Sequence, residues 1–511
     1  MFHSWLRATE RKEGTVRNEI RSRVIRSLGL ALAVCLATSV IPVSTNAQIT
    51  FERTYGGSFS DVAHSVIQTL DGGYATAGFT WSSGAGVSDV YLIRTDSLGS
   101  VLWDSTYGGI SFDVGYSLQQ TFDGGYVITG STRSSGAGLN DVYLIKMDSL
   151  GNTLWDTTYG GDSSDVGRSV AQTLDGGYII AGETWSFDPG TSDVYLIKTD
   201  SSGNVLWDTT YGGSFDDFGY SVQQTSDGGY IVAGQTFSFG AGLGDVYLIK
   251  TDSLGNVLWD TTYGGGFWDV GYSVDRTSDN GFVVAGQTFS FGAGQGDVYL
   301  IKTDSLGSVL WDTTYGGDSS DVGLSAVQTL DEGYVVAGYT WSFGSSEQDV
   351  YIVKTDSLGS VLWERTYGDS VDDRGYSIQQ TMDGGYIAAG YTRSMGAGVN
   401  DVYLIKTDAN GMVVGVEEKS KLRTHNVRLL KNVPNPFDGS TVIYYSLQVP
   451  DRVILQIYDV TGRSVENLVN EDRTPGVHQV NWDGQGRASG IYFCKLKAGE
   501  FTDVQKMILL R

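Results

Sequence analysis

The strongest constraint on the fold of this chain is a short phrase that recurs at constant spacing. The tyrosine of a "TYG" phrase returns every 52 residues without an insertion, at Tyr55, Tyr107, Tyr159, Tyr211, Tyr263, Tyr315 and Tyr367. Seven copies at this period predict a solenoid or a β-propeller, in which each copy buries its apolar face against its neighbours.

The pattern inside one repeat separates these two architectures. Four short segments alternate in polarity or are rich in β-branched residues, and Gly, Asp and Asn turn signals separate them. They are "GYSVQQT" (219–225), "YIVAGQT" (230–236), "DVYLIKTD" (245–252) and "NVLWDTTYG" (256–264). Runs of this length predict antiparallel strands, and no helical period is present. Four strands in about 50 residues are typical of a propeller blade, so we expect an all-β, seven-bladed β-propeller.

The two ends of the repeat array predict how the ring closes. A tryptophan opens the fourth strand in six repeats, but the next position in step is Gly415 and no "TYGG" follows it. The missing strand stands at the front of the array as "ITFERTYGG" (49–57), with Phe51 in the tryptophan position. We therefore expect the N-terminal strand to complete the last blade, which would cover two otherwise open sheet edges.

The segment "TDSLGNVLW" resembles the tryptophan-docking phrase of quinoprotein-type propellers, although its turn is one residue shorter. Asp252, Gly255 and Trp259 match the order of that phrase. The resemblance implies that the aromatic ring locks neighbouring blades together, and it does not imply a bound quinone. The predicted blade-locking residues are Phe51, Trp103, Trp155, Trp207, Trp259, Trp311 and Trp363.

Four aspartates recur in every repeat, and we interpret them as structural because all seven blades share them. Asp accepts backbone N–H bonds within turns, whereas sevenfold-identical catalysis would be unusual. Calcium is the alternative, since loops such as "GGDSSDVG" (160–167) offer oxygen ligands, but no loop has the D-x-D-x-D-G spacing. The few histidines are scattered. We predict no catalytic residue, no metal site and no cofactor, with calcium as the one cofactor left open.

Candidate ligand-binding residues lie where the copies differ, since shared positions serve the frame. The repeats diverge in the loop after the fourth strand and in the loop between the second and third strands, and strand alternation places both loops on one face. One position in the second loop is always aromatic or arginine, which suits stacking on sugars or holding a peptide. These residues are Trp81, Arg133, Trp185, Phe237, Phe289, Trp341 and Arg393. The alternative interpretation is that the rings simply cover the blade ends.

The N-terminal segment and the charge restrict destination and partners. Residues 1–47 have the arginine-rich start, apolar run and small-residue cleavage site of a signal peptide, and the run is short for a transmembrane anchor. The whole chain has a net charge of −25, with −32 in residues 48–419 and +3 in residues 420–511. A field this negative repels phosphate and anionic headgroups, so we expect no nucleic-acid partner.

The last part of the chain lacks the repeat. After the propeller (48–412) and a charged linker (413–428), residues 429–511 alternate in polarity with Gly and Pro turns, which predicts a small β-sandwich. "PNPF" (434–437), "YDVTGR" (458–463) and "SGIYF" (489–493) resemble the C-terminal sorting domain of type IX secretion. This resemblance implies contact with the type IX machinery and export to the outside or the outer-membrane surface of a Gram-negative-type bacterium.

These observations predict a secreted or cell-surface propeller that binds a glycan or a protein, as a monomer. The alternative is an extracellular polysaccharide lyase or hydrolase, which should break the blade symmetry at a few polar positions. Glu183, Glu332 and Glu347 are the acids that do so. Most deviations are aromatic or small instead, which favours binding over catalysis.

Overall fold

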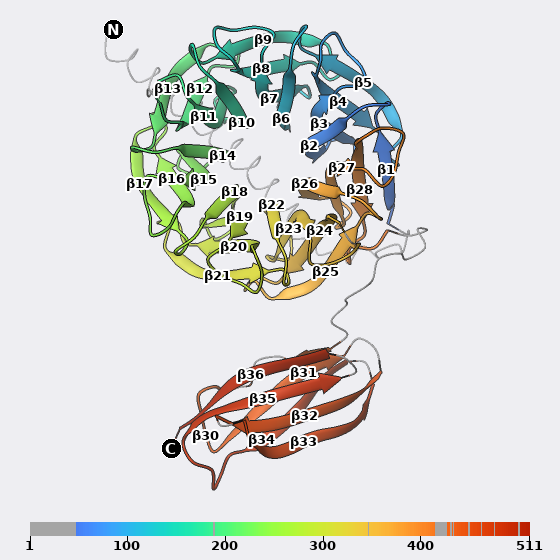
Figure 1. Cartoon of the computed structure of the whole chain (residues 1–511), viewed down its shortest axis with the longest axis vertical. Helices are drawn as coiled ribbons and strands as arrows, with labels where there is room; N and C mark the ends of the chain where they lie inside the picture. The colour runs from blue at the N-terminus through green and yellow to red at the C-terminus, as the bar shows by residue number, and fades with distance from the viewer. Residues whose placement is uncertain are drawn as a thin grey trace, which may run out of the picture. The chain divides into compact units, whose positions relative to one another are not determined.

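The computed structural model describes residues 48–187, 190–345, 347–413, 427–429, 432, 434–447, 450–460, 462–474, 476–498 and 501–510. The predicted signal peptide (1–47) and nearly all of the predicted linker (413–428) lie outside the described residues. Figure 1 shows seven four-stranded sheets arranged radially in a ring, followed along the chain by a separate β-domain. The predicted fold class, a seven-bladed β-propeller with a C-terminal β-domain, is confirmed.

Six blades contain four consecutive strands each, in order from the axis outward. They are β2 (Asp61–Gln68), β3 (Tyr74–Thr80), β4 (Asp89–Thr95) and β5 (Val101–Tyr107); β6 (Asp113–Gln120), β7 (Tyr126–Thr132), β8 (Asp141–Met147) and β9 (Thr153–Tyr159); β10 (Asp165–Gln172), β11 (Tyr178–Thr184), β12 (Asp193–Thr199) and β13 (Val205–Tyr211); β14 (Asp217–Gln224), β15 (Tyr230–Thr236), β16 (Asp245–Thr251) and β17 (Val257–Tyr263); β18 (Asp269–Arg276), β19 (Phe282–Thr288), β20 (Asp297–Thr303) and β21 (Val309–Tyr315); and β22 (Asp321–Gln328), β23 (Tyr334–Thr340), β24 (Asp349–Thr355) and β25 (Val361–Tyr367).

Burial explains the residue pattern of these strands. The second and third strands of a blade, such as β15 and β16, are buried along their whole length, whereas the outermost strand β17 alternates between exposed and partly buried residues. Strands covered on both faces by neighbouring blades need apolar or small residues at every position. Gly234 is required in β15, because a Cβ there would lie 1.8 Å from the carbonyl oxygen of Phe218 on the adjacent strand.

The seventh blade is closed by the N-terminal strand, as the sequence predicts. β1 (Phe51–Tyr55) pairs antiparallel with β28 (Asp401–Thr407), which continues to β27 (Tyr386–Thr392) and the innermost strand β26 (Asp373–Gln380). Phe51 is buried in a cluster with residues of the first and last blades. The ring therefore ends without an unpaired edge at its junction.

The C-terminal domain consists of two sheets packed around one apolar core. One sheet contains β29 (Val427–Leu429), β31 (Ser440–Leu447) and β34 (Gly476–Asp483). The other contains β30 (Phe437–Asp438), β36 (Phe501–Leu510), β35 (Gly490–Ala498), β32 (Asp451–Asp459) and β33 (Ser464–Arg473). Trp482 is fully buried between them, with edge contacts to Phe437 and Tyr492. The lone Cys494 is buried in this core.

Candidate functional site

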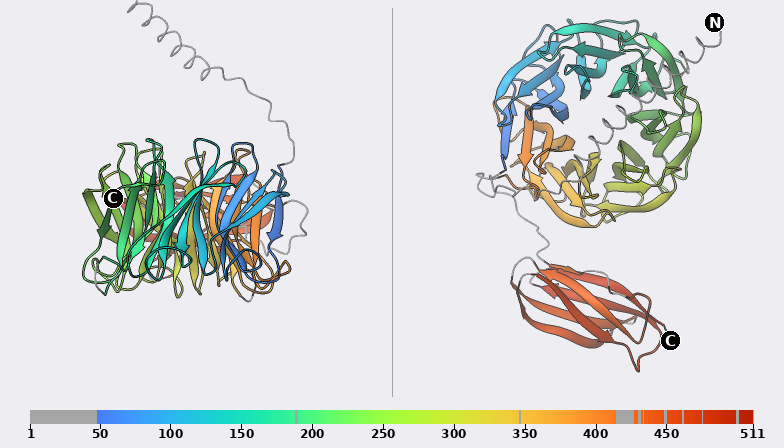
Figure 2. Two further views of the ribbon diagram at one scale, coloured as in Figure 1. Left: turned by 90° about the horizontal axis from the view of Figure 1, so that it is seen from above. Right: turned by 180° about the vertical axis from the view of Figure 1, so that it is seen from behind.

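The propeller presents two faces with different loops, seen edge-on in the left view of Figure 2. One face, which we call the loop face, contains the loops between the second and third strands and the loops that connect one blade to the next. These two kinds of loop are joined by backbone hydrogen bonds, as where the N–H of Asp113 donates to the carbonyl of Ser88 at 2.8 Å. The opposite side, the turn face, contains the "DGG" and "SLG" turns. The structure thus brings the two divergent loops together on one face.

The seven predicted ligand-binding residues all open the loop after the second strand, and all are exposed on the loop face. The exposed fraction is 50% for Trp81, 38% for Trp185 and 43% for Trp341. Their backbones are held, since the N–H of Trp81 donates to the carbonyl of Ser60 at 2.9 Å and the equivalent bond forms in every blade. We call Trp81, Trp185, Phe237, Phe289 and Trp341 the aromatic crown.

The two arginines at the crown position are engaged by neighbours. Arg133 donates from Nε to Asn140 at 2.7 Å, and its guanidinium lies 5.6 Å from the ring centre of Phe112. Arg393 forms an ion pair with Asp372 at 3.1 Å. These contacts hold both cations at the rim of the loop face.

The predicted blade-locking residues lie between neighbouring blades. Each ring packs against the aromatic residue that opens the second strand of the next blade, as for Trp207 and Tyr230 with ring centres 5.8 Å apart. The same contact joins Phe51 to Tyr74 across the closure. The turn glycine of the next blade lies under the ring, since a Cβ on Gly255 would come within 2.9 Å of Trp207.

The recurring aspartates accept hydrogen bonds from local donors, although the Oδ1 atoms of Asp61, Asp217, Asp269 and Asp321 are buried without a hydrogen-bond partner in the described part of the chain. Asp61 accepts from the N–H of Gly57 and from the hydroxyl of Ser82, both at 2.7 Å. Asp279 of a "DGG"-type turn pairs at 2.9 Å with Lys302, whose side chain is only 4% exposed, and every blade has an equivalent ion pair. Within the residues that the structure describes, no group of three or more His, Cys, Asp or Glu side chains is placed to hold a metal ion. The prediction of no cofactor, with calcium as the one alternative left open, stays a prediction.

The three acids that break the repeat do not come together. Glu183 is buried on β11, where Arg168 donates to it from Nε at 3.0 Å and from an η nitrogen at 2.5 Å. Glu332 stands at a positive φ of 64° in a turn on the turn face. Glu347 is exposed in a loop of the loop face. No pair of these carboxyl groups shares a site.

A set of residues at the axis of the ring is absent from the sequence predictions. The pairing of the innermost strand with its neighbour shifts by one residue at the same place in each blade, as between Ala63 and Ser65. Such a bulge turns the extra side chain in a new direction. The ring of His64 lies 5.1 Å from Tyr116 and 4.9 Å from Tyr376, which belong to the two adjacent blades. The bulged residues form an axial ring: His64, Tyr116, Arg168, Tyr220, Tyr272, Leu324 and Tyr376.

A circle of hydrogen bonds joins the innermost strands of neighbouring blades next to the axial ring. The hydroxyl of the serine after each bulge accepts from a backbone N–H of the next innermost strand. The bonds measure 3.2 Å from Leu118 to Ser65 and 3.1 Å from Val66 to Ser377 across the closure. Equivalent bonds in the other five blades complete the circle. The axial side chains therefore project from a frame that hydrogen bonds hold in register.

The charged members of the axial ring are electrostatically coupled. Burial, reinforced by the charge of Arg168, lowers the pKa of His64 to about 4, so this imidazole is neutral at pH 7. Burial alone would lower the pKa of Arg168, but the carboxylate of Glu183 more than offsets this and raises it. The guanidinium of Arg168 also lies 4.6 Å from the ring centre of Tyr116. This part of the axis combines aromatic faces with one internally neutralised cation.

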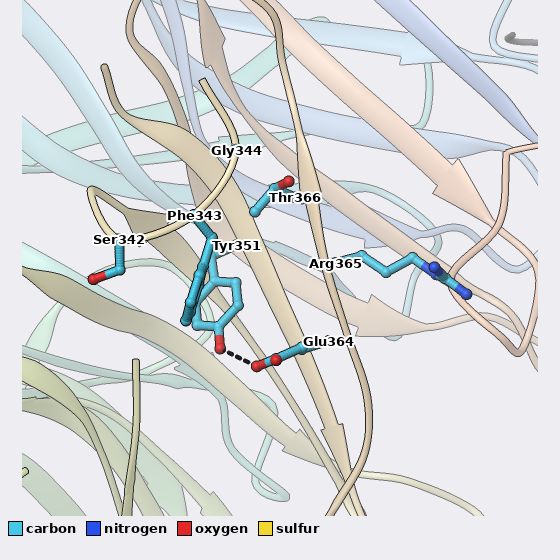
Figure 3. Close-up of a pocket in the computed structure, with 7 residues that line it drawn as sticks. All are labelled: Ser342, Phe343, Gly344, Tyr351, Glu364, Arg365 and Thr366. Atoms are coloured by element: carbon cyan, nitrogen blue, oxygen red, sulfur yellow. Dashed lines mark hydrogen bonds between the residues drawn. The ribbon is translucent and has the colours of Figure 1, made fainter. Parts of the chain in front are cut away.

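Figure 3 shows a pocket of about 210 Å³ on the outer side of the sixth blade, lined by Phe343, Tyr351 and Glu364 among others. The hydroxyl of Tyr351 donates to Glu364 at 2.5 Å. Five other blades contain the same contact with Asp in place of Glu. This repetition indicates that the Tyr–acid pair is structural. A neighbouring cavity of about 460 Å³ is also lined by Phe343 and Glu364.

Comparison with known proteins identifies one part of the chain. Residues 433–510 match the family described as the secretion system C-terminal sorting domain. A curated relative, the regulatory protein FlaEY of Caulobacter vibrioides, is 27% identical over 222 residues. That alignment covers 39% of this chain and 22% of FlaEY, so the chain spans less than a quarter of the length of this relative.

Two solved structures are among those to which this chain is similar. PorZ, a surface component of the type IX secretion system of Porphyromonas gingivalis, is 13% identical, with 89% of this chain and 60% of PorZ covered and a TM-score of 0.37. A fungal alcohol oxidase of the AA5 family is 11% identical, with 90% and 99% covered and a TM-score of 0.41.

The described residues include no helix that is long and apolar enough to cross a membrane. The family match agrees with the quoted motifs of the C-terminal segment, and it extends over both sheets of the C-terminal domain. Residues 433–510 are a sorting domain of type IX secretion, and this chain is a β-propeller protein exported to the cell surface or the extracellular space.

Proposed function

We propose that the propeller is a binding module that holds an extended glycan across its loop face. The observation that carries this proposal is the aromatic crown: five rings at equivalent positions, between 37% and 50% exposed, on backbones fixed by hydrogen bonds. Rings that are held in place and left open to solvent can stack on the flat faces of sugar units at little entropic cost.

The arrangement of the crown suits a repeating ligand. One ring stands on each of five blades, so separate parts of one glycan chain can meet separate rings. Several weak contacts made by one polymer add up to useful affinity, because each later contact is intramolecular. The separation of Glu183, Glu332 and Glu347 favours this function over the alternative of a polysaccharide-cleaving enzyme, which needs acids placed together.

Replacing Trp81, Trp185 and Trp341 by alanine tests the proposal. Stacking contributes about 0.5–1.5 kcal/mol per ring, so we expect the triple variant to lose about 10- to 1,000-fold in affinity. The chain from residue 48 onward is screened on a glycan array, and the best ligand is then titrated by calorimetry against both proteins.

Two controls make the result interpretable. Phenylalanine at the same three positions should retain most of the binding, because it keeps an aromatic face. Alanine at Phe122, which is 71% exposed but lies on the turn face, should change nothing. Unchanged binding by the triple alanine variant, or its unfolding in circular dichroism, contradicts the proposal.

A further inference from the structure

A second arginine of the innermost strands stands beside the axial ring in a different setting. Arg374 lies on β26, at a position where the other six innermost strands have valine or phenylalanine. Its guanidinium lies 4.5 Å from the ring centre of Tyr339 and 5.9 Å from that of Tyr391, and its Nε donates to the side-chain oxygen of Gln348. Two aromatic faces and one amide thus fix the plane of this cation.

The charge of Arg374 is not neutralised by an acid in the described part of the chain. No carboxylate there lies within ion-pairing distance of it, and Asp372 nearby is paired with Arg393. Burial acts to lower the pKa of Arg374, but the phenol groups of Tyr391, Tyr339 and Tyr376 outweigh it and raise the pKa. The guanidinium therefore stays charged at any working pH while partly buried.

In the third blade, by contrast with Arg374, the arginine near the axis has a carboxylate partner. There Arg168 forms a bidentate ion pair with Glu183, which lies on the second strand of the same blade. In the seventh blade the equivalent second-strand position is Tyr391. The chain thus supplies a carboxylate to one arginine near the axis and leaves the other open, although the propeller as a whole is strongly acidic.

We propose that Arg374 binds the carboxylate of a uronic acid unit in the glycan, an inference that rests on the proposed glycan-binding function. A planar guanidinium whose position is fixed by neighbouring side chains is suited to a carboxylate, which accepts two parallel hydrogen bonds from it. Tyr339 beside it is partly exposed and can contact the rest of the sugar. The net charge of −32 in residues 48–419 repels a polyanion, so the site selects a glycan with isolated acidic units.

The test uses a matched pair of oligosaccharides, one neutral and one identical except for a single glucuronic acid branch. Because a hydrogen bond to a charged group is stronger than a neutral one, the wild-type chain should bind the acidic member about 10- to 100-fold more tightly. Arg374→Gln should bind both members with the affinity of the neutral one. Arg276→Gln, which removes an exposed arginine at the turn-face end of another innermost strand, should retain the preference.

A second arm separates this inference from the glycan proposal. Free glucuronate should raise the melting temperature of the wild-type chain but not that of Arg374→Gln, and glucose should raise neither. The crown triple variant should weaken both oligosaccharides equally and keep the glucuronate response. Equal binding of the pair by the wild type, or no glucuronate response, overturns the carboxylate site.

The arms also distinguish the source of the carboxylate. If a short peptide with a free C-terminus raises the melting temperature at lower concentration than glucuronate does, and its amide does not, the sugar assignment is wrong. If Arg374→Gln melts well below the wild type without any ligand, Arg374→Lys serves in its place. This variant keeps the charge but cannot form bidentate hydrogen bonds, so it should lose most of the preference for the acidic oligosaccharide.

Discussion

At the scale of residues, the repeated "TYG" tyrosine forms a hydrogen bond with a turn glycine of the next blade. The hydroxyl of Tyr107 donates to the carbonyl of Gly151 at 2.7 Å, 44 residues later, and the same bond forms in all seven blades. This bond explains why the "TYG" tyrosine and the "SLG" glycine recur together. A tyrosine hydroxyl that is buried needs such a partner, because an unsatisfied polar group is costly.

Acid should destabilise the propeller through His64. In the unfolded chain this histidine takes up a proton near its ordinary pKa of 6.5, whereas in the folded protein it does so only near pH 4. Stability is therefore complete above about pH 6.5 and is lost progressively as the pH falls towards 4. The loss should amount to roughly 3 kcal/mol once the pH is below 4.

The variant His64→Tyr tests this expectation, since tyrosine occupies the axial ring in four other blades. Urea unfolding at pH 7 and at pH 4 should show a smaller loss of unfolding free energy for the variant than for the wild type. The aspartates titrate in both proteins and cancel from the comparison. Equal losses in the two proteins would show that His64 has no part in the acid response.

At the scale of elements, the closing strand β1 joins the two ends of the blade array. β1 covers the edge of β28, Phe51 fills the cluster between the first and last blades, and Tyr55 donates to Gly99 at 2.6 Å. All other strands of the ring are joined to their blade by short turns. β1 alone reaches its blade from the other end of the array, and its loss would expose an edge of unpaired backbone groups.

Deletion of residues 48–57 should therefore lower the unfolding free energy by several kcal/mol, since losing a buried phenylalanine alone costs about 3–5 kcal/mol. The deletion variant should also associate at rising protein concentration through its open edge. Thermal unfolding and analytical ultracentrifugation measure the two effects. Phe51→Trp, which restores the residue of the other six blades, is the control expected to remain stable and monomeric. A deletion variant that melts with the intact chain would disprove the role of β1.

At the scale of the whole molecule, the two folded parts have separate tasks. The propeller contains the crown and the axial ring, whereas residues 433–510 match a sorting domain. The C-terminal domain has its own buried core around Trp482, independent of the apolar clusters of the blades. Sorting and binding can therefore be separated by truncation.

Removal of residues 429–511 should leave a folded propeller inside the cell envelope of the native host. Fractionation with an antibody to the propeller follows the protein, and circular dichroism of the purified truncated chain checks the fold. Fusing residues 413–511 to an unrelated periplasmic protein should export that protein in the same host. Normal export of the truncated chain would show that the sorting signal lies elsewhere.

The sequence alone determined the blade architecture and its closure. Constant spacing forces seven equal units, and the absence of a tryptophan near Gly415 together with Phe51 at the front predicts which strand completes the ring. The crown could also be found, because Trp81 and its equivalents are always aromatic or arginine at the start of a loop that differs between copies. These features depend on period and local pattern, which are properties of the chain itself.

Only the tertiary structure revealed the site at the axis. A bulge in each innermost strand turns His64, Arg168 and their equivalents inward, and strand alternation does not predict where a bulge falls. The divergence of this position between copies was a signal that could have been read. The contact of Arg374 with Tyr339 joins two blades, and the lack of an acid beside it depends on the packing of several strands. Sequence spacing contains no measure of such distances, because ring closure decides which blades become neighbours.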